Sequence, residues 1–165
     1  MSIDAFVRNP FFWALLSMFG LLGAAAVTSS RKMTSRPLFF LGSLLLPALG
    51  HTMLVLPFVN QLRFESTGWH WYVGGAILLA SLVFEISGFL PVRDFDEEDA
   101  QVRLKIGGFY SIVRHPMYVG DILYALGIAF IFRSVAGVAM LPVWVASFTF
   151  LLTVEEELLE ERLGE

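Results

Sequence analysis

The sequence predicts an all-α fold, a multi-pass bundle of transmembrane helices. The chain has 165 residues, of which 56% are hydrophobic and 16% are charged, and its mean hydropathy is +0.70. A soluble domain of this length needs more polar surface to cover itself. The apolar runs are long, rich in Leu and Ala, and do not alternate, which is typical of helices rather than of membrane strands. We therefore expect the excess apolar surface to face lipid.

About five segments reach the roughly 20 mainly apolar residues that a spanning helix needs. Pro37 and Pro116 stand in the first turn of two of them, where proline is favoured, and Pro91 ends a third. The last two are separated only by a short stretch around Arg133, which predicts a tight helical hairpin. The expected spans are Phe11–Val27, Leu38–Val59, Trp69–Leu90, Met117–Phe132 and Val135–Val154.

The first span is free of charge and longer than the usual core of a signal peptide, and before it only Arg8 is basic. We therefore expect a retained helix rather than a cleaved signal.

Basic residues cluster on alternate connections between the spans. Because cytoplasmic loops carry an excess of Lys and Arg, we expect the N-terminus outside and the C-terminus in the cytosol. An odd number of spans agrees with this orientation. The basic connections carry Arg31, Lys32 and Arg36 after the first span and Arg93, Arg103, Lys105 and Arg114 after the third, whereas the other two carry only Arg63 and Arg133.

Several classes of function are excluded by composition and motifs. A formal net charge of −4 argues against a nucleic-acid partner, whose binders carry a basic patch. The chain has no cysteine, which excludes disulfides, thiolate metal sites and a cysteine nucleophile. No dinucleotide-binding glycine pattern, P-loop or nucleophile elbow occurs. The histidines, His51, His70 and His115, are too scattered to predict a metal site.

The stretch that carries most chemistry is Gly-Gly-Phe-Tyr-Ser-Ile-Val-Arg-His-Pro-Met-Tyr-Val-Gly, residues 107–120. Pro116 presets a helix start, so we expect Arg114 and His115 at a helix N-terminus, where free N–H groups and the helix dipole favour an anion. Arg114 adds a guanidinium fork that fits a carboxylate or a phosphate. Gly107 and Gly108 allow close backbone approach to a ligand.

Gly120 and Gly127 lie two turns apart on one face of the expected fourth span. Small residues at such positions let a neighbouring helix or a ligand come close, and for the glycines taken alone helix packing is the favoured interpretation.

A second polar motif, Glu-Glu-Glu-Leu-Leu-Glu-Glu at residues 155–161, continues the last span out of the membrane. If the last two spans form a hairpin, these carboxylates arrive beside Arg114. The run from Gly108 to Gly127 with Arg114-His115-Pro116, followed a hairpin later by Glu155-Glu156, resembles the isoprenylcysteine carboxyl methyltransferase and phospholipid methyltransferase superfamily of integral membrane enzymes. The resemblance covers roughly the last 60 residues. Where this superfamily usually continues with Phe-Gly and an aromatic residue, Leu163-Gly164 stands here.

The resemblance implies S-adenosylmethionine as cofactor, transfer of its methyl group to a membrane-embedded lipid-like or isoprenoid acceptor, and a cytosolic active site. It implies one transmembrane domain over residues 1–165, with generic helices in 11–91 and the cofactor-binding and catalytic part in 92–165. The implied catalytic residues are Arg114, His115 and Glu155. The implied cofactor-binding residues are Gly108, Tyr110, Arg114, His115, Pro116, Tyr118, Gly120, Glu155 and Glu156.

The two adjacent glutamates cannot share one role, because neighbouring helical residues project about 100° apart. We expect Glu155 to meet the ammonium group of the cofactor or to orient Arg114, and Glu156 to contact the basic loop through Arg103 or Lys105.

Ionisable residues inside expected spans are costly and often functional. On this ground His51, Glu85 and Asp121 are candidate substrate contacts. Two other functions stay open. With Asp121 directly after Gly120, the sequence also resembles that of membrane sterol reductases. Those enzymes share the Arg-His-Pro motif and use a reduced nicotinamide cofactor. A non-catalytic membrane protein that keeps the fold is the third possibility. The sequence leaves the methyl acceptor and the oligomeric state open.

Overall fold

The computed structural model describes residues 3–29, 37–89 and 108–163. Within these ranges the chain forms six α-helices and a short 3-10 turn, without a β-strand, so the predicted all-α class is confirmed. The elements are α1 (Ile3–Val7), α2 (Pro10–Ser29), α3 (Pro37–Val55), α4 (Trp69–Phe89), the 3-10 turn η2 (Gly108–Ser111), α5 (Pro116–Ile131) and α6 (Val135–Leu163).

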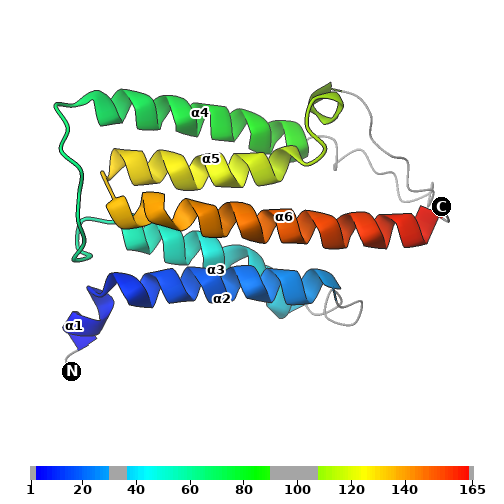
Figure 1. Ribbon diagram of the computed structural model, residues 1–165, viewed down its shortest axis with the longest axis horizontal. Helices are drawn as coiled ribbons and strands as arrows, with labels where there is room; N and C mark the ends of the chain where they lie inside the picture. The colour runs from blue at the N-terminus through cyan, green and yellow to red at the C-terminus, as the bar shows by residue number, and fades with distance from the viewer. Residues whose placement is uncertain (1–2, 30–36, 90–107, 164–165) are drawn as a thin grey trace.

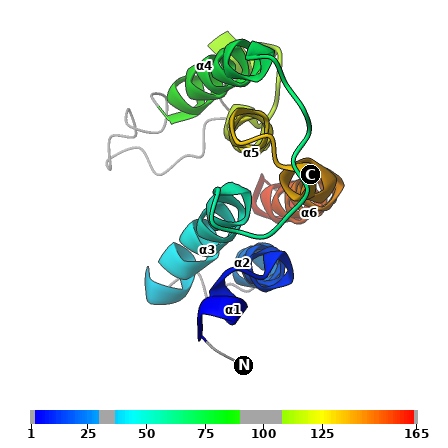
Figure 2. The same ribbon diagram turned by 90° about the vertical axis from the view of Figure 1, so that its left-hand side faces the viewer.

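The five long helices lie side by side, and α6 extends beyond the others at its C-terminal end (Figure 1). Viewed from the end, α2 pairs with α3 and α4 pairs with α5, while α6 lies against both pairs (Figure 2). Helices α5 and α6 run in opposite directions, so the start of α5 and the late turns of α6 lie toward the same end of the bundle (Figure 1).

Two helices of the described chain are long and apolar enough to cross a membrane, over Trp69–Gly88 and Val135–Val154. Three further apolar stretches are shorter, at Pro10–Ala24, Leu45–Val55 and Pro116–Ile131. Large apolar side chains on the outer surfaces of α2 and α4, such as Phe19 and Leu79, are each 67% exposed. Apolar surface of this kind is expected of helices that face lipid.

Proline and glycine set several helix ends. Pro116 occupies the first turn of α5, as expected. Gly68 has φ of +106° and precedes α4. The second expected span is too long, because α3 ends at Val55 rather than at Val59. The reason is Pro57, which removes a backbone donor and disfavours helical geometry at the residue before it.

The turn between α5 and α6 is closed by its own backbone. Arg133 adopts a left-handed conformation with φ of 54°, and its N–H donates to Phe130 O at 3.0 Å. The N–H of Ser134 donates to Ala129 O at 2.8 Å, which completes the Schellman pattern of a helix C-terminus. The Ser134 hydroxyl then caps α6 by accepting from Gly137 N at 2.8 Å.

The connection from α3 to α4, residues 56–68, is tied to this turn. Arg63 donates to the carbonyls of Val55 at 3.2 Å and Leu56 at 2.7 Å, and also to that of Phe132. Ser134 donates to the side-chain oxygen of Gln61. One guanidinium therefore joins carbonyls at the C-terminal ends of α3 and α5. We call this set of contacts around Arg63 the latch.

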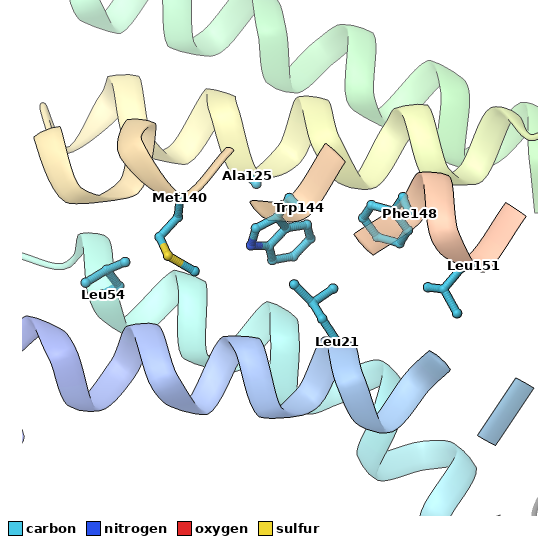
Figure 3. Packing of buried hydrophobic residues seen from close by; sticks show 7 residues of the cluster. All are labelled: Leu21, Leu54, Ala125, Met140, Trp144, Phe148 and Leu151. Atoms are coloured by element: carbon cyan, nitrogen blue, oxygen red, sulfur yellow. The ribbon is translucent and has the colours of Figure 1, made fainter. Parts of the chain in front are cut away.

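The central core lies along the inner face of α6 (Figure 3). It consists of Leu21, Leu54, Ala125, Met140, Trp144, Phe148 and Leu151, which come from α2, α3, α5 and α6. Because α6 supplies most of the large side chains, it is the element against which both helix pairs bury their apolar faces. The core therefore fixes the position of α6 relative to the start of α5.

Candidate functional site

An ion pair lies at the end of the bundle where α5 begins. Arg114 Nη1 donates to Glu156 Oε1 at 2.9 Å, and the two side chains are 82% and 43% exposed. Arg114 precedes α5, and Glu156 lies on the part of α6 that continues past its apolar span. The antiparallel course of α5 and α6 thus brings together residues that are 42 positions apart in the sequence.

A stack of rings lies next to this ion pair. The rings of His115 and Tyr118 are almost parallel, 5.6 Å apart with an angle of 5°. Tyr118 also stacks on Phe148 of α6, with centroids 4.9 Å apart. The first turn of α5 is therefore held against α6 by aromatic contacts. Phe148 is not among the site residues predicted from the sequence. Its position four residues after Trp144, on the same helix face, is the signal that points to it.

Tyr110 is held against α4. Its hydroxyl donates to Gly88 O at 3.2 Å, and the neighbouring Phe109 packs edge-on against Phe84 with centroids 5.4 Å apart. The turn η2, which begins at Gly108, thus packs against the C-terminal end of α4 and leads along the chain to Arg114.

Gly120 and Gly127 pack against α4. A Cβ atom on Gly120 would lie 2.6 Å from Glu85 Oε1, and one on Gly127 would lie 2.7 Å from Leu78 Cδ2. Ser81 donates its hydroxyl to Gly120 O at 2.9 Å. Both glycines therefore allow α4 and α5 to approach closely, which agrees with the helix-packing interpretation.

Two carboxyl groups belong to the neighbouring helices α4 and α5, Glu85 to α4 and Asp121 to α5. Glu85 lies against Gly120, and Asp121 follows Gly120 in the chain. Both side chains are half-buried. Glu85 lies near the end of the apolar helix α4, and Asp121 is the sixth residue of the apolar helix α5. Among the described residues, the ion pair of Arg114 is formed with Glu156 rather than with Asp121.

His51 lies deeper in the bundle and away from the other site residues. It is fully buried, and its Nε2 lies 3.1 Å from Ala125 O, in the middle of α5. Its ring packs edge-on against Trp144, with centroids 5.2 Å apart. The neighbouring Thr52 and Tyr124 share a hydrogen bond of 2.9 Å between α3 and α5. The predicted site residues therefore form two groups, one at the start of α5 and one at mid-bundle.

The comparison with protein families decides the family of this chain. The family model named phospholipid methyltransferase matches residues 67–165, which is more than half of the sequence. The chain belongs to the phospholipid methyltransferase family. Membership in this family implies a membrane methyltransferase. No curated protein and no solved structure matches the chain.

The family match divides the predicted site residues. The ion pair, the His115–Tyr118 stack, Glu85 and Asp121 all lie inside the matched residues 67–165, whereas His51 lies before them. The side chain of Glu155 lies outside the described part of the structure, as do Arg103, Lys105 and Gly107. The contact of a C-terminal glutamate with Arg114 is made by Glu156, to which the sequence analysis gave a different partner.

Proposed function

We propose that the chain is an S-adenosylmethionine-dependent methyltransferase that methylates a lipid-like or isoprenoid acceptor in the membrane. The observation that carries the proposal is the Arg114–Glu156 ion pair at the start of α5, inside the part that matches the family model. A guanidinium and a carboxylate side by side match the carboxylate and the ammonium of the amino-acid end of the cofactor. Both side chains are substantially exposed and therefore accessible.

The residues at the start of α5 suit this cofactor. The helix dipole and the backbone N–H groups favour the cofactor carboxylate next to Arg114. The flat faces of His115 and Tyr118 suit a planar ring or the cationic sulfonium. Gly108, Tyr110 and Pro116 shape the same end, and Glu155 remains a candidate partner of the cofactor ammonium. When bound, S-adenosylmethionine supplies the methyl group.

The acceptor is proposed to reach the site from the bilayer. Glu85 of α4 and Asp121 of α5 are half-buried, and we expect them to contact a cationic or hydrogen-bonding group of an acceptor held in the apolar part of the bundle. Positioning of the acceptor atom against the methyl group, with water excluded, accounts for much of the rate in reactions of this type.

We further propose five membrane spans in one domain over residues 1–165, with the last two as a hairpin and residues 92–165 as the cofactor-binding and catalytic part. The distribution of basic residues supports a cytosolic C-terminus and an external N-terminus. A reporter that works only in the cytosol should give a signal when it is fused to the C-terminus. An active reporter of the external side would contradict the orientation.

Ligand-dependent thermal stability tests the proposed activity. A ligand that binds the folded protein stabilises it by about 2.7 kcal/mol at a hundredfold excess over its Kd. We expect S-adenosylhomocysteine to raise the Tm of the detergent-solubilised protein. Stabilisation by NADPH instead would point to a reductase, and no response to either ligand would point to a non-catalytic protein. Transfer of labelled methyl groups into extracted lipids would then identify the acceptor class.

A further inference from the structure

Two polar rings meet at the centre of the bundle. His51 of α3 is 0% exposed and Trp144 of α6 is 2% exposed. Their rings pack edge-on with centroids 5.2 Å apart and an angle of 70°. Trp144 lies among the apolar side chains of the core, with Met140 and Leu54 nearby (Figure 3). A polar pair in such surroundings calls for an explanation, because most residues there are aliphatic or aromatic.

Each ring leaves one polar atom unpaired. In the described part of the chain, His51 Nδ1 and Trp144 Nε1 are buried and have no hydrogen-bond partner. The large majority of buried side-chain polar atoms in proteins are paired, because leaving one unpaired costs the free energy of its desolvation. Two such atoms on rings in contact point to a group that satisfies both.

The hydrogen-bonding roles of the two atoms are opposite. His51 Nε2 lies 3.1 Å from Ala125 O, and a carbonyl can only accept, so Nε2 carries the hydrogen. An imidazolium without a counter-charge would be costly at full burial, so the ring is neutral and Nδ1 is an acceptor. The indole Nε1 of Trp144 can only donate. The matching group must therefore accept from Trp144 and donate to His51.

This requirement selects among ligands. A hydroxyl group accepts and donates at the same oxygen, whereas a carboxylate cannot donate and an ammonium group cannot accept. We propose that His51 and Trp144 bind a hydroxyl group at the centre of the bundle, supplied either by a lipid or by a water molecule. The lipid case rests on the proposed function, since the lipid would be a methyl acceptor, whereas the water case does not.

The position of this hydroxyl site suits a ligand that extends from the start of α5. Ala125, which holds His51, follows His115 by about ten residues, or roughly 15 Å of helix at 1.5 Å per residue. Between them, Trp144 contacts Phe148 at 5.6 Å between centroids, and Phe148 contacts Tyr118 at 4.9 Å. A continuous row of rings thus connects the hydroxyl site with the Arg114 end. A lipid hydroxyl bound here would set the depth of the acceptor.

Nuclear magnetic resonance of the indole N–H groups tests the proposal on the intact protein. The chain has only four tryptophans, so the ¹⁵N-labelled protein in phosphatidylcholine nanodiscs, whose lipid carries no hydroxyl, should give four indole signals. Trp144→Phe assigns the signal of Trp144. If that variant does not fold, the corresponding Phe substitutions at Trp13, Trp69 and Trp71 assign the other three signals, and the remaining signal belongs to Trp144. Trp13, whose Nε1 donates to Val7 O at 2.7 Å, is the internal reference for a hydrogen-bonded indole.

We expect the Trp144 proton to resonate as far downfield as that of Trp13. A cross peak to water in phosphatidylcholine alone identifies water as the source. A further shift on adding dioleoylglycerol, but not its acetylated counterpart, identifies a lipid hydroxyl. An upfield, unbonded Trp144 signal with neither a water cross peak nor a response to dioleoylglycerol would overturn the proposal. Because no cofactor or turnover is involved, this result is independent of the thermal test of the methyltransferase activity.

Discussion

The two ends of the bundle each place an arginine beside helix termini, but they use it in opposite ways. At the latch, Arg63 is partly buried and donates to three carbonyl groups. At the start of α5, Arg114 is 82% exposed and has Glu156 as its ion-pair partner. The guanidinium of Arg63 donates hydrogen bonds within the protein, whereas most of the guanidinium of Arg114 is accessible to a ligand.

The difference follows from what each end has to do. Carbonyls at helix C-terminal ends need donors, and a cation there also interacts favourably with the helix dipole. Satisfying them from the α3–α4 connection stabilises the fold. An exposed ion pair contributes only about 0–1 kcal/mol to stability, so its charges can be redirected to a ligand at little cost. The latch end is therefore expected to govern stability and the Arg114 end to govern binding.

The largest expected effect is on cofactor binding in Arg114→Ala. Loss of a charge-assisted pair with the cofactor carboxylate should weaken binding by about 2–4 kcal/mol. Isothermal titration with S-adenosylhomocysteine measures the loss. Because the ion pair with Glu156 is exposed, the Tm without ligand should stay within the error of the measurement. Unchanged affinity in this variant would remove Arg114 from the cofactor site.

Arg63→Met is expected to show the reverse pattern. It keeps much of the side-chain volume but leaves the carbonyls of Val55, Leu56 and Phe132 without their donor. We expect a loss of about 2–3 kcal/mol in the free energy of unfolding, measured by denaturation in mild detergent. Cofactor affinity of the remaining folded protein should be unchanged. A stable Arg63→Met protein with weakened cofactor binding would contradict the assignment of separate roles to the two ends.

Glu156→Gln should have a smaller effect, confined to the Arg114 end. The cofactor loses its sulfonium charge as the methyl group leaves, so a carboxylate near the cofactor serves binding more than the chemical step. We expect the KM for S-adenosylmethionine to rise by about tenfold, or 1.4 kcal/mol, with kcat changed less. Glu157→Gln, on the same turn and exposed, is the matched control.

Glu155→Gln tests in the same assay whether the adjacent glutamate also contributes, as the sequence analysis expects. Wild-type constants in both the Glu155 and the Glu156 variants would leave these residues as surface charge.

Much of the fold could be predicted from apolar length and from proline. Pro116 marks the start of α5, and the apolar run from Val135 marks α6, because both signals act locally. Hydropathy alone predicts the end of α3 too late, because apolar residues continue to Val59 although Pro57 disfavours helical geometry before it. The latch could not be predicted, since it depends on carbonyls of two helices that meet Arg63 only in the folded bundle.

For the candidate site, the sequence indicates residue types but not the contacts between them. The motif around Arg114 indicates one end of the bundle, while the contact of Arg114 with Glu156 depends on the rotation of α6 about its axis. Sequence spacing gives only the angle between Glu155 and Glu156. The sequence does not single out Trp144 and Phe148, because aromatic residues are common throughout membrane helices.

The smallest expected effect lies in the turn beside the latch and would stabilise the protein. Arg133 holds a left-handed φ of 54°, at the position of the Schellman motif that glycine favours. That conformation costs a residue with a Cβ about 1–2 kcal/mol, and glycine loses about 0.5–1 kcal/mol more in chain entropy on folding. Arg133→Gly should therefore gain about 0.5 kcal/mol, or roughly 1–2 °C in Tm at this chain length.

Arg133→Ala separates strain from charge. Arg133 also lies near enough to Arg63 for the two positive charges to repel each other, and this repulsion contributes to lowering the pKa of Arg63 after the larger effect of burial. Both variants remove the charge, but only glycine relieves the backbone. If strain dominates, Arg133→Gly is more stable than Arg133→Ala in thermal unfolding. An Arg133→Gly protein less stable than Arg133→Ala would assign the gain to relief of the charge repulsion with Arg63, because glycine then adds only its greater loss of chain entropy.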